Sequence, residues 1–410
     1  MSKKQKPLNT KSNKNIGLAS ITAQDNFDPH TLIAPHSAPI YTSSTYVYES
    51  ADKAQQVFRG EEKAYIYSRW SHPNAELAEG KIEQLETYGL NIKAKALLFS
   101  TGMGAISALF QSLLQPGDAV LAQGNIYGTT VDYFNHYGDA YKIQVIYADF
   151  ANLNSLEETL KQHKNIKLLY TETPSNPTLN CYNLKAIADL AHKYKAKAAV
   201  DNTFASPYLQ QPFKFGIDYI VHSATKYLNG HGTALSGALL STDVKHMTDT
   251  VWKVRKINGT ICSPFDAWLL NLGMKTLSLR MEQHCANAMA VAKYLQSHEA
   301  ISKVNYLGLK DHPDHALAKK QMRNYGGVLS FELKKGYKAG EKLMKKIKFC
   351  KLTASLGTID TLIQHPASMS HYFVPKAQRE QYGITDGLIR LSIGIEDVND
   401  VIADLEQALR

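Results

Sequence analysis

The chain has 410 residues, more than a single hydrophobic core usually organises, which favours two domains. Its 44% hydrophobic and 20% charged residues are typical of a globular protein, and no apolar run approaches the roughly 20 residues that span a bilayer. Five lysines within residues 1–15 account for much of the net charge of +9, and the remaining 395 residues carry only +4, which offers little support for nucleic-acid recognition.

The first 75 residues divide into a tail and an arm. Residues 1–15 are polar and basic, and we expect a disordered solubilising tail there. Residues 16–75 are rich in Ser, Thr, Tyr and Pro and predict an irregular N-terminal arm. No apolar secretory signal is present, and we expect a cytoplasmic protein. The four cysteines, at positions 181, 262, 285 and 350, are too scattered for zinc or a disulfide framework, so we expect reduced thiols and no metal.

Short β-rich runs alternate with helical patterns from residue 76 to residue 276. The predicted strands are Ala96–Ser100, Ala119–Ala122, Gln144–Tyr147, Leu168–Glu172, Ala198–Asp201, Tyr219–His222 and Gly237–Leu240. The predicted helices include Glu76–Tyr88, Met103–Leu114, Leu153–Gln162 and Leu184–Tyr194. This alternation indicates an α/β domain with a mostly parallel sheet covered on both faces. Ligands of such sheets bind beyond the carboxyl ends of the strands.

The pattern changes over residues 277–410. Helical segments are interrupted there by two apolar runs, Gly327–Leu333 and Leu388–Gly394. The spacing of Val398, Val401, Leu405 and other apolar residues predicts a closing amphipathic helix. We therefore expect a smaller α+β C-terminal domain.

A lysine stands just beyond one of the predicted strands, in the segment Val221–His231. An amine in such a place becomes nucleophilic when it is desolvated or lies near another cation. Ser223 and Thr225 precede this residue, Lys226, and could donate to a phosphate. By spacing alone, a lysine that points into water is an equally good interpretation.

Polar residues follow three other predicted strands. Asp201 could pair with a protonated pyridine nitrogen, although an acid that caps the next helix has the same pattern. The turn Thr101-Gly102-Met103 joins a strand to a helix and could bind an anion through backbone N–H groups, or could be purely structural. Asn176 lies in a turn between two prolines, where it could donate to a ligand oxygen or serve the turn itself.

Together these segments resemble, in order and spacing, the trans-sulfuration (cystathionine/methionine metabolism) family of fold-type I enzymes, which depend on pyridoxal 5'-phosphate (PLP). The resemblance covers roughly residues 16–410. Its most specific parts are Ser223–Tyr227 with Gly230-His231, and the segments His365–Met369 and Gly387–Gly394. It implies the fold of an aspartate aminotransferase-like PLP-dependent transferase, with residues 76–276 as the PLP-binding domain.

The resemblance also implies roles for individual residues at the cofactor. Lys226 resembles the lysine that forms an imine with PLP and later moves protons, and Asp201 the acid that pairs with the ring nitrogen. Asn176 is similar to the donor to the phenolic oxygen of the ring. Tyr127 resembles the tyrosine that stacks on the ring and protonates the γ leaving group. The phosphate is implied to bind at the Thr101–Met103 turn and at the hydroxyls of Ser223 and Thr225.

Further residues are implied to bind the substrate and a second subunit. Arg390 resembles the arginine that binds the substrate α-carboxylate, with help from the backbone at Ser355. Tyr67 and Arg69 resemble a pair that reaches the phosphate of a neighbouring subunit. The implied assembly is a homotetramer of two dimers that share their active sites.

The substrate is less clear, because different positions resemble different subfamilies. Cystathionine γ-lyases and γ-synthases carry a glutamate where this chain has Ala354, which looks more like methionine γ-lyases and O-acetylhomoserine sulfhydrylases. Our first expectation is γ-elimination from methionine by a methionine γ-lyase-like enzyme. Thr129 and Arg255 depart from the familiar methionine γ-lyases, so a cystathionine γ-lyase or γ-synthase and an O-acylhomoserine sulfhydrylase stay open. We expect these three positions to choose the substrate. A non-catalytic scaffold with this fold is the remaining alternative.

Overall fold

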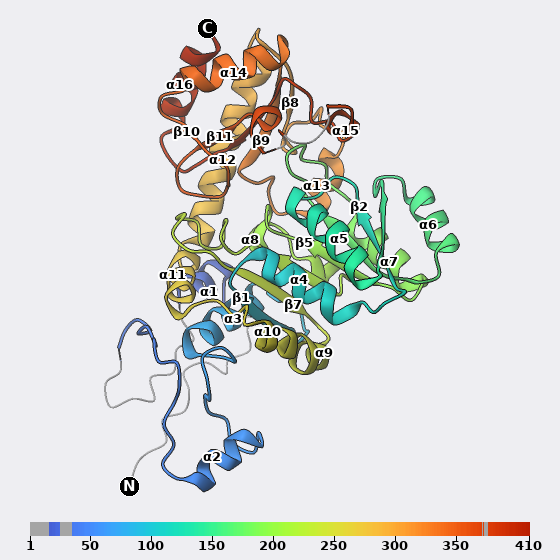
Figure 1. The fold of residues 1–410 in the computed structure, drawn as a ribbon. Helices are drawn as coiled ribbons and strands as arrows, with labels where there is room; N and C mark the ends of the chain where they lie inside the picture. The colour runs from blue at the N-terminus through green and yellow to red at the C-terminus, as the bar shows by residue number, and fades with distance from the viewer. Residues whose placement is uncertain (1–15, 25–34, 371, 373–375) are drawn as a thin grey trace.

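A computed structural model describes the chain except residues 1–15, 25–34, 371 and 373–375, so the predicted tail lies outside the described residues. Seven strands form the larger sheet in the order β1-β7-β6-β5-β4-β2-β3 (Figure 1). β7 runs antiparallel to both of its neighbours, and the other paired strands are parallel. The strands are β1 (Lys95–Phe99), β2 (Ala119–Gln123), β3 (Gln144–Ala148), β4 (Ile166–Glu172), β5 (Lys197–Asp201), β6 (Tyr219–His222) and β7 (Gly237–Ser241). The predicted mostly parallel sheet is confirmed, and each predicted strand lies within two residues of an observed one.

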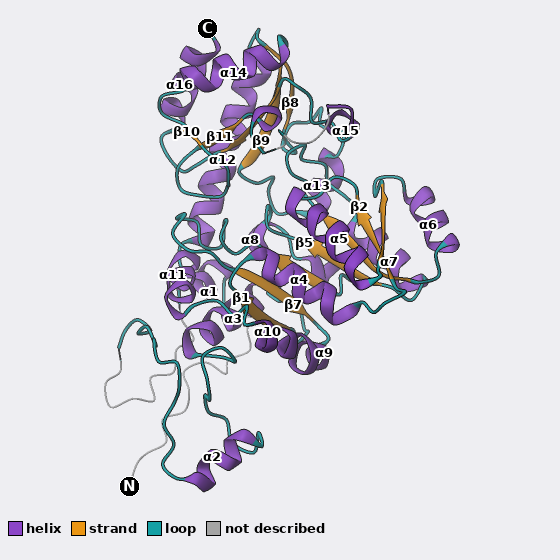
Figure 2. Ribbon diagram, viewed as in Figure 1, coloured by secondary structure: helices purple, strands orange, loops and turns teal. Residues whose placement is uncertain are grey.

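Both faces of this sheet are covered, because successive side chains of a strand point to opposite sides. In β1, Leu97 and Phe99 pack into one apolar cluster with α4 and α5, whereas Ala96 and Leu98 pack into another with α3 and α7. Figure 2 shows these helices on either side of the strands. The helices of this region are α3 (Pro73–Glu86), α4 (Gly102–Leu113), α5 (Gly128–Tyr141), α6 (Leu153–Gln162), α7 (Leu184–Lys193), α8 (Ser206–Leu209), α9 (Val244–His246), α10 (Trp252–Asn258) and α11 (Pro264–Met274).

The predicted irregular arm contains two short helices, α1 (Leu18–Ala23) and α2 (Ala51–Phe58). The hydroxyl of Ser50 caps α2 by accepting from the N–H of Lys53 at 3.1 Å. α3 begins at Pro73, three residues before the predicted start, because the side chain of His72 accepts from the N–H of Ala75 at 3.2 Å. In both cases a polar residue caps the start of the helix, at a position where the apolar pattern of the sequence gives no signal.

A second sheet has five strands in the order β10-β11-β12-β9-β8. These strands are β8 (Ile301–Asn305), β9 (Val328–Leu333), β10 (Lys351–Leu352), β11 (Leu362–Gln364) and β12 (Leu388–Ser392). The accompanying helices are α12 (Leu277–Ser297), α13 (His315–Gln321), α14 (Gly336–Lys346), α15 (Lys376–Gln381) and α16 (Val398–Leu409). The smaller α+β unit is thus confirmed, with β9, β12 and α16 as predicted. The sequence prediction missed β8, β10 and β11, because β10 and β11 have only two and three residues and β8 interrupts its apolar pattern with Ser302 and Lys303.

α12 connects the two parts of the molecule (Figure 1). It packs on α1 and α8 near the larger sheet and on β8, β9 and α16 near the smaller one. The division into units of residues 76–276 and 277–410 remains our proposal, with the second unit beginning at the start of this helix. No helix within the described part of the chain is long and apolar enough to cross a membrane.

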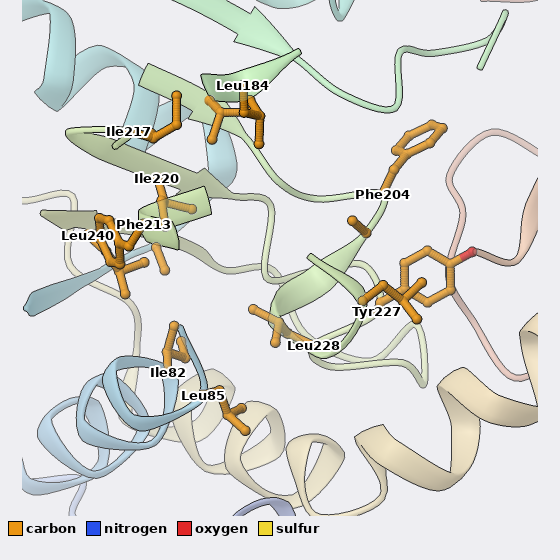
Figure 3. Packing of buried hydrophobic residues seen from close by; sticks show 14 of the residues in the cluster. Ile82, Leu85, Leu184, Phe204, Phe213, Ile217, Ile220, Tyr227, Leu228 and Leu240 are labelled. Atoms are coloured by element: carbon orange, nitrogen blue, oxygen red, sulfur yellow. The ribbon is translucent and has the colours of Figure 1, made fainter. Parts of the chain in front are cut away.

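One apolar cluster lies directly beneath the end of β6. Figure 3 shows Tyr227 and Leu228 in this cluster with Ile220 and with residues of α3. The side chains of Tyr227 and Leu228 are 1% and 2% exposed. Because both neighbours are buried in a close-packed core, the backbone that carries Lys226 has little freedom to move.

Candidate active site

The carboxyl ends of β4, β5 and β6 bring the predicted site residues together at one edge of the larger sheet. Glu172 ends β4 and pairs in register with Asp201, which ends β5, and Asp201 pairs in turn with Val221 of β6. The segment Ser223–Lys226 follows β6 directly. The sheet therefore places three chemically active segments side by side, as the strand-end argument anticipated.

Lys226 lies at the junction between the two parts of the chain. Its amine donates a hydrogen bond to the hydroxyl of Ser355 at 2.7 Å. Burial, followed by the nearby guanidinium of Arg390, lowers the pKa of Lys226 from its ordinary value to about 8. Of the two interpretations of this lysine, the structure supports the desolvated amine near a cation and not a side chain that points into water.

Arg390 of β12 is 4% exposed and contacts the same serine. It donates to the backbone carbonyl of Ser355 and, at 3.1 Å, to the side-chain oxygen of Asn176. Ser355 has a φ of +89°, a conformation that residues other than glycine rarely adopt. In this conformation the hydroxyl of Ser355 accepts from Lys226 while its backbone carbonyl accepts from Arg390.

Glu172 is a member of the site that the sequence prediction left out. Its two carboxylate oxygens accept from the backbone N–H groups of Tyr127 and Asn176, each at 2.9 Å. Burial, followed by the charge of Asp201, raises the pKa of Glu172 to about 8. Glu172 therefore positions the two loops that carry Tyr127 and Asn176. An acid that ends a buried strand next to Asp201 was the sequence signal that could have found it.

Asp201 is 9% exposed, and burial raises the pKa of its carboxyl group. One of its oxygens accepts from the N–H of Thr203 at 2.9 Å, and among the described residues it forms no ion pair. A buried carboxylate of this kind is stabilised by a cationic partner. A protonated pyridine ring would supply that partner, so Asp201 fits the expected cofactor.

The Thr101–Met103 turn has the form of an anion site at the start of a long helix. The hydroxyl of Thr101 caps α4 by accepting from the N–H of Gly104 at 2.9 Å. Gly102 lies so close to Ser223 that an added Cβ atom would stand 3.0 Å from the Cβ of that serine. The missing side chain at residue 102 lets Ser223 approach the start of α4, where backbone N–H groups could bind an anion.

Other predicted cofactor contacts are less direct. The hydroxyl of Thr225 donates to the carbonyl of Ser236 at 3.1 Å and accepts from its N–H at 3.0 Å, so its own proton is already engaged. Tyr127 is 47% exposed, and its hydroxyl forms no hydrogen bond with another described residue. Tyr67 and Arg69 are not brought to the other residues, because Arg69 donates to the carbonyl of Lys256 at 2.6 Å and lies over the ring of Tyr67.

One of the three positions expected to choose the substrate does not do so. Arg255 is 1% exposed and forms an ion pair with Glu79 at 2.6 Å. It also donates to the carbonyls of Leu98 and Trp70, and these contacts occupy the guanidinium away from any substrate. The expectation was wrong for Arg255, because sequence position cannot show that this arginine is buried. Thr129 and Ala354, in contrast, are exposed.

Comparison with known proteins agrees with this geometry. The family model described as "Cys/Met metabolism PLP-dependent enzyme" matches residues 19–410. An L-methionine gamma-lyase of Fusobacterium nucleatum subsp. polymorphum is 43% identical over 374 residues, which cover 90% of this chain and 92% of that protein. A cystathionine beta-lyase of Coxiella burnetii is 38% identical over 382 residues, which cover 93% of this chain and 95% of that protein. The crystal structure of cystathionine gamma synthase from Xanthomonas oryzae pv. oryzae in complex with cystathionine superposes with a TM-score of 0.89 at 36% identity, covering 96% of this chain and 98% of that one.

The lowered pKa of Lys226 predicts how the apoprotein takes up PLP. Only the neutral amine can attack the aldehyde, so the rate at which added PLP turns the protein yellow should rise about fivefold from pH 7 to pH 8 and level off above pH 9. Arg390→Met removes a cation that disfavours the ammonium, which raises the pKa of Lys226 and moves the midpoint to higher pH. Stopped-flow absorbance measures both rates.

Lys226→Ala provides the control for this prediction and should show the absorption of free PLP at every pH, with no imine formed. A wild-type midpoint near pH 10 would contradict the desolvated amine. Wild-type protein that stays colourless after PLP addition would favour the non-catalytic scaffold.

The crowding at Gly102 predicts a selective loss of PLP affinity. In Gly102→Ala the new methyl group meets Ser223, and we expect PLP to bind about tenfold more weakly, which corresponds to about 1.4 kcal/mol. Gly128 likewise begins a helix, but an added Cβ would meet nothing within 4 Å, so Gly128→Ala is the matched control. Equal PLP dissociation constants for the two variants, measured by absorbance titration, would exclude a phosphate site at Gly102.

Proposed function

The chain belongs to the Cys/Met metabolism family of PLP-dependent enzymes, and we propose that it is a carbon–sulfur lyase that eliminates the γ-substituent of methionine. PLP is its cofactor. The observation that carries the proposal is the contact of Ser355 with both Lys226 and Arg390, because it joins a proton-accepting amine to a carboxylate-binding guanidinium. The relatives named L-methionine gamma-lyase support methionine as the substrate.

Five residues would hold the cofactor, two of them at its ring and three at its phosphate. Bound PLP supplies an electron-withdrawing ring that makes the Cα proton of an attached amino acid acidic. Asp201 would keep the ring nitrogen protonated, and Asn176 would donate its amide to the phenolic oxygen. The N–H groups of Gly102 and Met103 would bind the phosphate, with the hydroxyl of Ser223 beside them.

The remaining residues would handle the substrate and its protons. Arg390 would pair with the α-carboxylate, as its buried guanidinium and its contact with Ser355 suggest. Lys226, with a pKa of about 8, would accept the Cα proton and then take part in proton removal at Cβ. Tyr127 would donate a proton to the departing thiolate. Glu172 would keep Tyr127 and Asn176 in place through their backbone N–H groups.

A second candidate is a cystathionine lyase or synthase. It is favoured by the cystathionine beta-lyase of Coxiella burnetii and by the structural likeness to cystathionine gamma synthase. Cystathionine carries a distal ammonium and carboxylate that a lyase for methionine has no need to bind. Ala354 offers no charge to that ammonium and is exposed, one residue before Ser355, which supports the smaller uncharged substrate.

We propose a cytoplasmic homotetramer in which pairs of subunits share active sites. The support is that Arg69 contacts Lys256 in its own chain and none of the cofactor residues described above. In Figure 1 the arm that carries α2 extends away from the two sheets. Such an arm could deliver Tyr67 and Arg69 to the phosphate of a second subunit.

The proposed substrate is tested by measuring turnover of methionine, homocysteine, cystathionine and O-acylated homoserines, each with and without an added thiol. We expect methionine to release methanethiol with a higher kcat/KM than cystathionine. Ala354→Glu should invert this preference, because a carboxylate there attracts the distal ammonium of cystathionine. Ala354→Gln is the size-matched control and should leave the preference unchanged. Turnover of cystathionine alone, or product formation that requires a thiol, would refute the elimination of methionine.

Shared active sites predict that two inactive variants restore activity when they are mixed. Lys226→Ala lacks the amine and Arg69→Ala lacks the phosphate contact. In a hybrid dimer, the site built on the Lys226 of one chain receives Arg69 from the other chain and is complete. We expect activity to return after the subunits are dissociated and reassembled together. If Arg69 served its own chain, the mixture would stay as inactive as the separate variants.

A further inference from the structure

A hollow lies beside the carboxyl ends of β2 and β3, next to the strands whose ends form the candidate active site. It is a cavity of about 460 Å³ between the two sheets. Gly124 and Asp149 line it from the larger sheet, and Lys303 of β8 and Tyr382 line it from the smaller unit. Its lining, as far as the chain is described, does not include Lys226. The volume is within the range of small-molecule sites, roughly 300–1,000 Å³.

The cavity has charges of opposite sign on opposite walls. Asp149 follows β3, and among the residues that the structure describes its carboxylate accepts only from the nearby N–H of Ala151, at 2.9 Å. Lys303 extends from β8 on the facing wall. Neither side chain forms an ion pair with any described residue. Both side chains are exposed, and Glu332 of β9 stands opposite Lys303 in the sheet. A molecule with a positive and a negative end would bridge the two walls through these opposite charges.

Neutral donors also line the cavity. His312 is 7% exposed, and its Nδ1 atom accepts from the N–H of Asp314 at 3.1 Å, which assigns the ring proton to Nε2. Burial lowers the pKa of His312, and the charge of Lys303 acts in the same direction while that of Asp314 opposes it. Asn180 accepts from the hydroxyl of Thr178 at 2.7 Å through its oxygen, so its amide NH₂ group can donate. Such donors beside a lysine suit a carboxylate.

An apolar surface completes the lining. Tyr147, Tyr182 and Tyr382 all border the cavity. The ring of Tyr382 lies directly on Gly124, where an added Cβ would stand 2.6 Å from the ring. These rings can pack against the side chain of a ligand.

We propose that this cavity binds a free α-amino acid with an apolar side chain, with its carboxylate at Lys303 and His312 and its ammonium at Asp149. This site is separate from the one at which the lyase reaction is proposed. It is connected to that reaction through Asn125, whose amide donates to the hydroxyl of Thr178 at 2.6 Å. Asn125 lies two residues before Tyr127, and Thr178 lies two residues after Asn176. An occupied cavity therefore stabilises both loops and raises turnover at limiting substrate.

The proposal is tested by counting bound amino acids on the holoenzyme. L-Norleucine resembles methionine but lacks a γ leaving group, so it binds without being consumed. Equilibrium dialysis with labelled L-norleucine should give two bound molecules per wild-type chain, only one of which changes the cofactor absorbance. Lys303→Met and Asp149→Asn should each lose the molecule that is silent in absorbance. Lys303→Arg should keep it, and Lys334→Met, an exposed lysine outside the cavity, is the matched control.

The possible outcomes separate this proposal from the proposed lyase activity. One norleucine per wild-type chain, or a silent molecule that persists in Lys303→Met, would overturn the amino-acid site. Release of methanethiol from methionine is measured independently and tests only the lyase activity. A silent site that is lost in Lys303→Met, while the absorbance change is kept, would establish the cavity as a second amino-acid site.

Discussion

The arrangement of the active site depends on two buried carboxyl groups that lie on neighbouring strands. Glu172 and Asp201 stand in register at the ends of β4 and β5, and each raises the cost of ionising the other. Neither has an ion-pair partner among the described residues. The backbone N–H groups of Tyr127 and Asn176 satisfy Glu172, so that two catalytic loops fold around one carboxylate. Asp201 has no such pair of backbone donors, and we propose that a protonated cofactor ring stabilises its buried carboxylate.

The second constraint is that the site needs both sheets. Lys226 comes from the larger sheet and Arg390 from the smaller one, and Ser355 contacts both. Two cations are thereby held in one buried region, and their mutual repulsion helps to lower the pKa of the lysine amine. A small shift of one unit against the other would separate Ser355 from Lys226 and allow the pKa of the amine to rise. The geometry of the fold therefore controls the chemistry of the lysine directly.

Much of this arrangement could be predicted from the sequence, because it depends on local patterns. Regular apolar runs followed by polar residues located the seven strands of the larger sheet and the ends where Asp201 and Lys226 lie. Elements with weak local signals were missed: β10 and β11 are very short, and α1 belongs to an arm without a regular apolar pattern. The role of Glu172 also escaped prediction, because its partners are backbone N–H groups of loops 45 residues upstream and four residues downstream.

The same distinction explains why substrate choice is harder to infer than the cofactor. Cofactor binding uses residues whose side chains or backbone are fixed by strands and helix starts, and such residues leave a pattern in the sequence. The positions that we expect to choose the substrate, Thr129 and Ala354, are exposed, and their surroundings are set by other segments of the chain or by a second subunit. Arg255 illustrates the difficulty. Its departure from the familiar methionine γ-lyases suggested a role in substrate choice, whereas its ion pair with Glu79 makes it part of the core. Specificity in this fold is therefore a property of the assembled site, and its determinants must be sought among exposed residues near Ser355 and Tyr127.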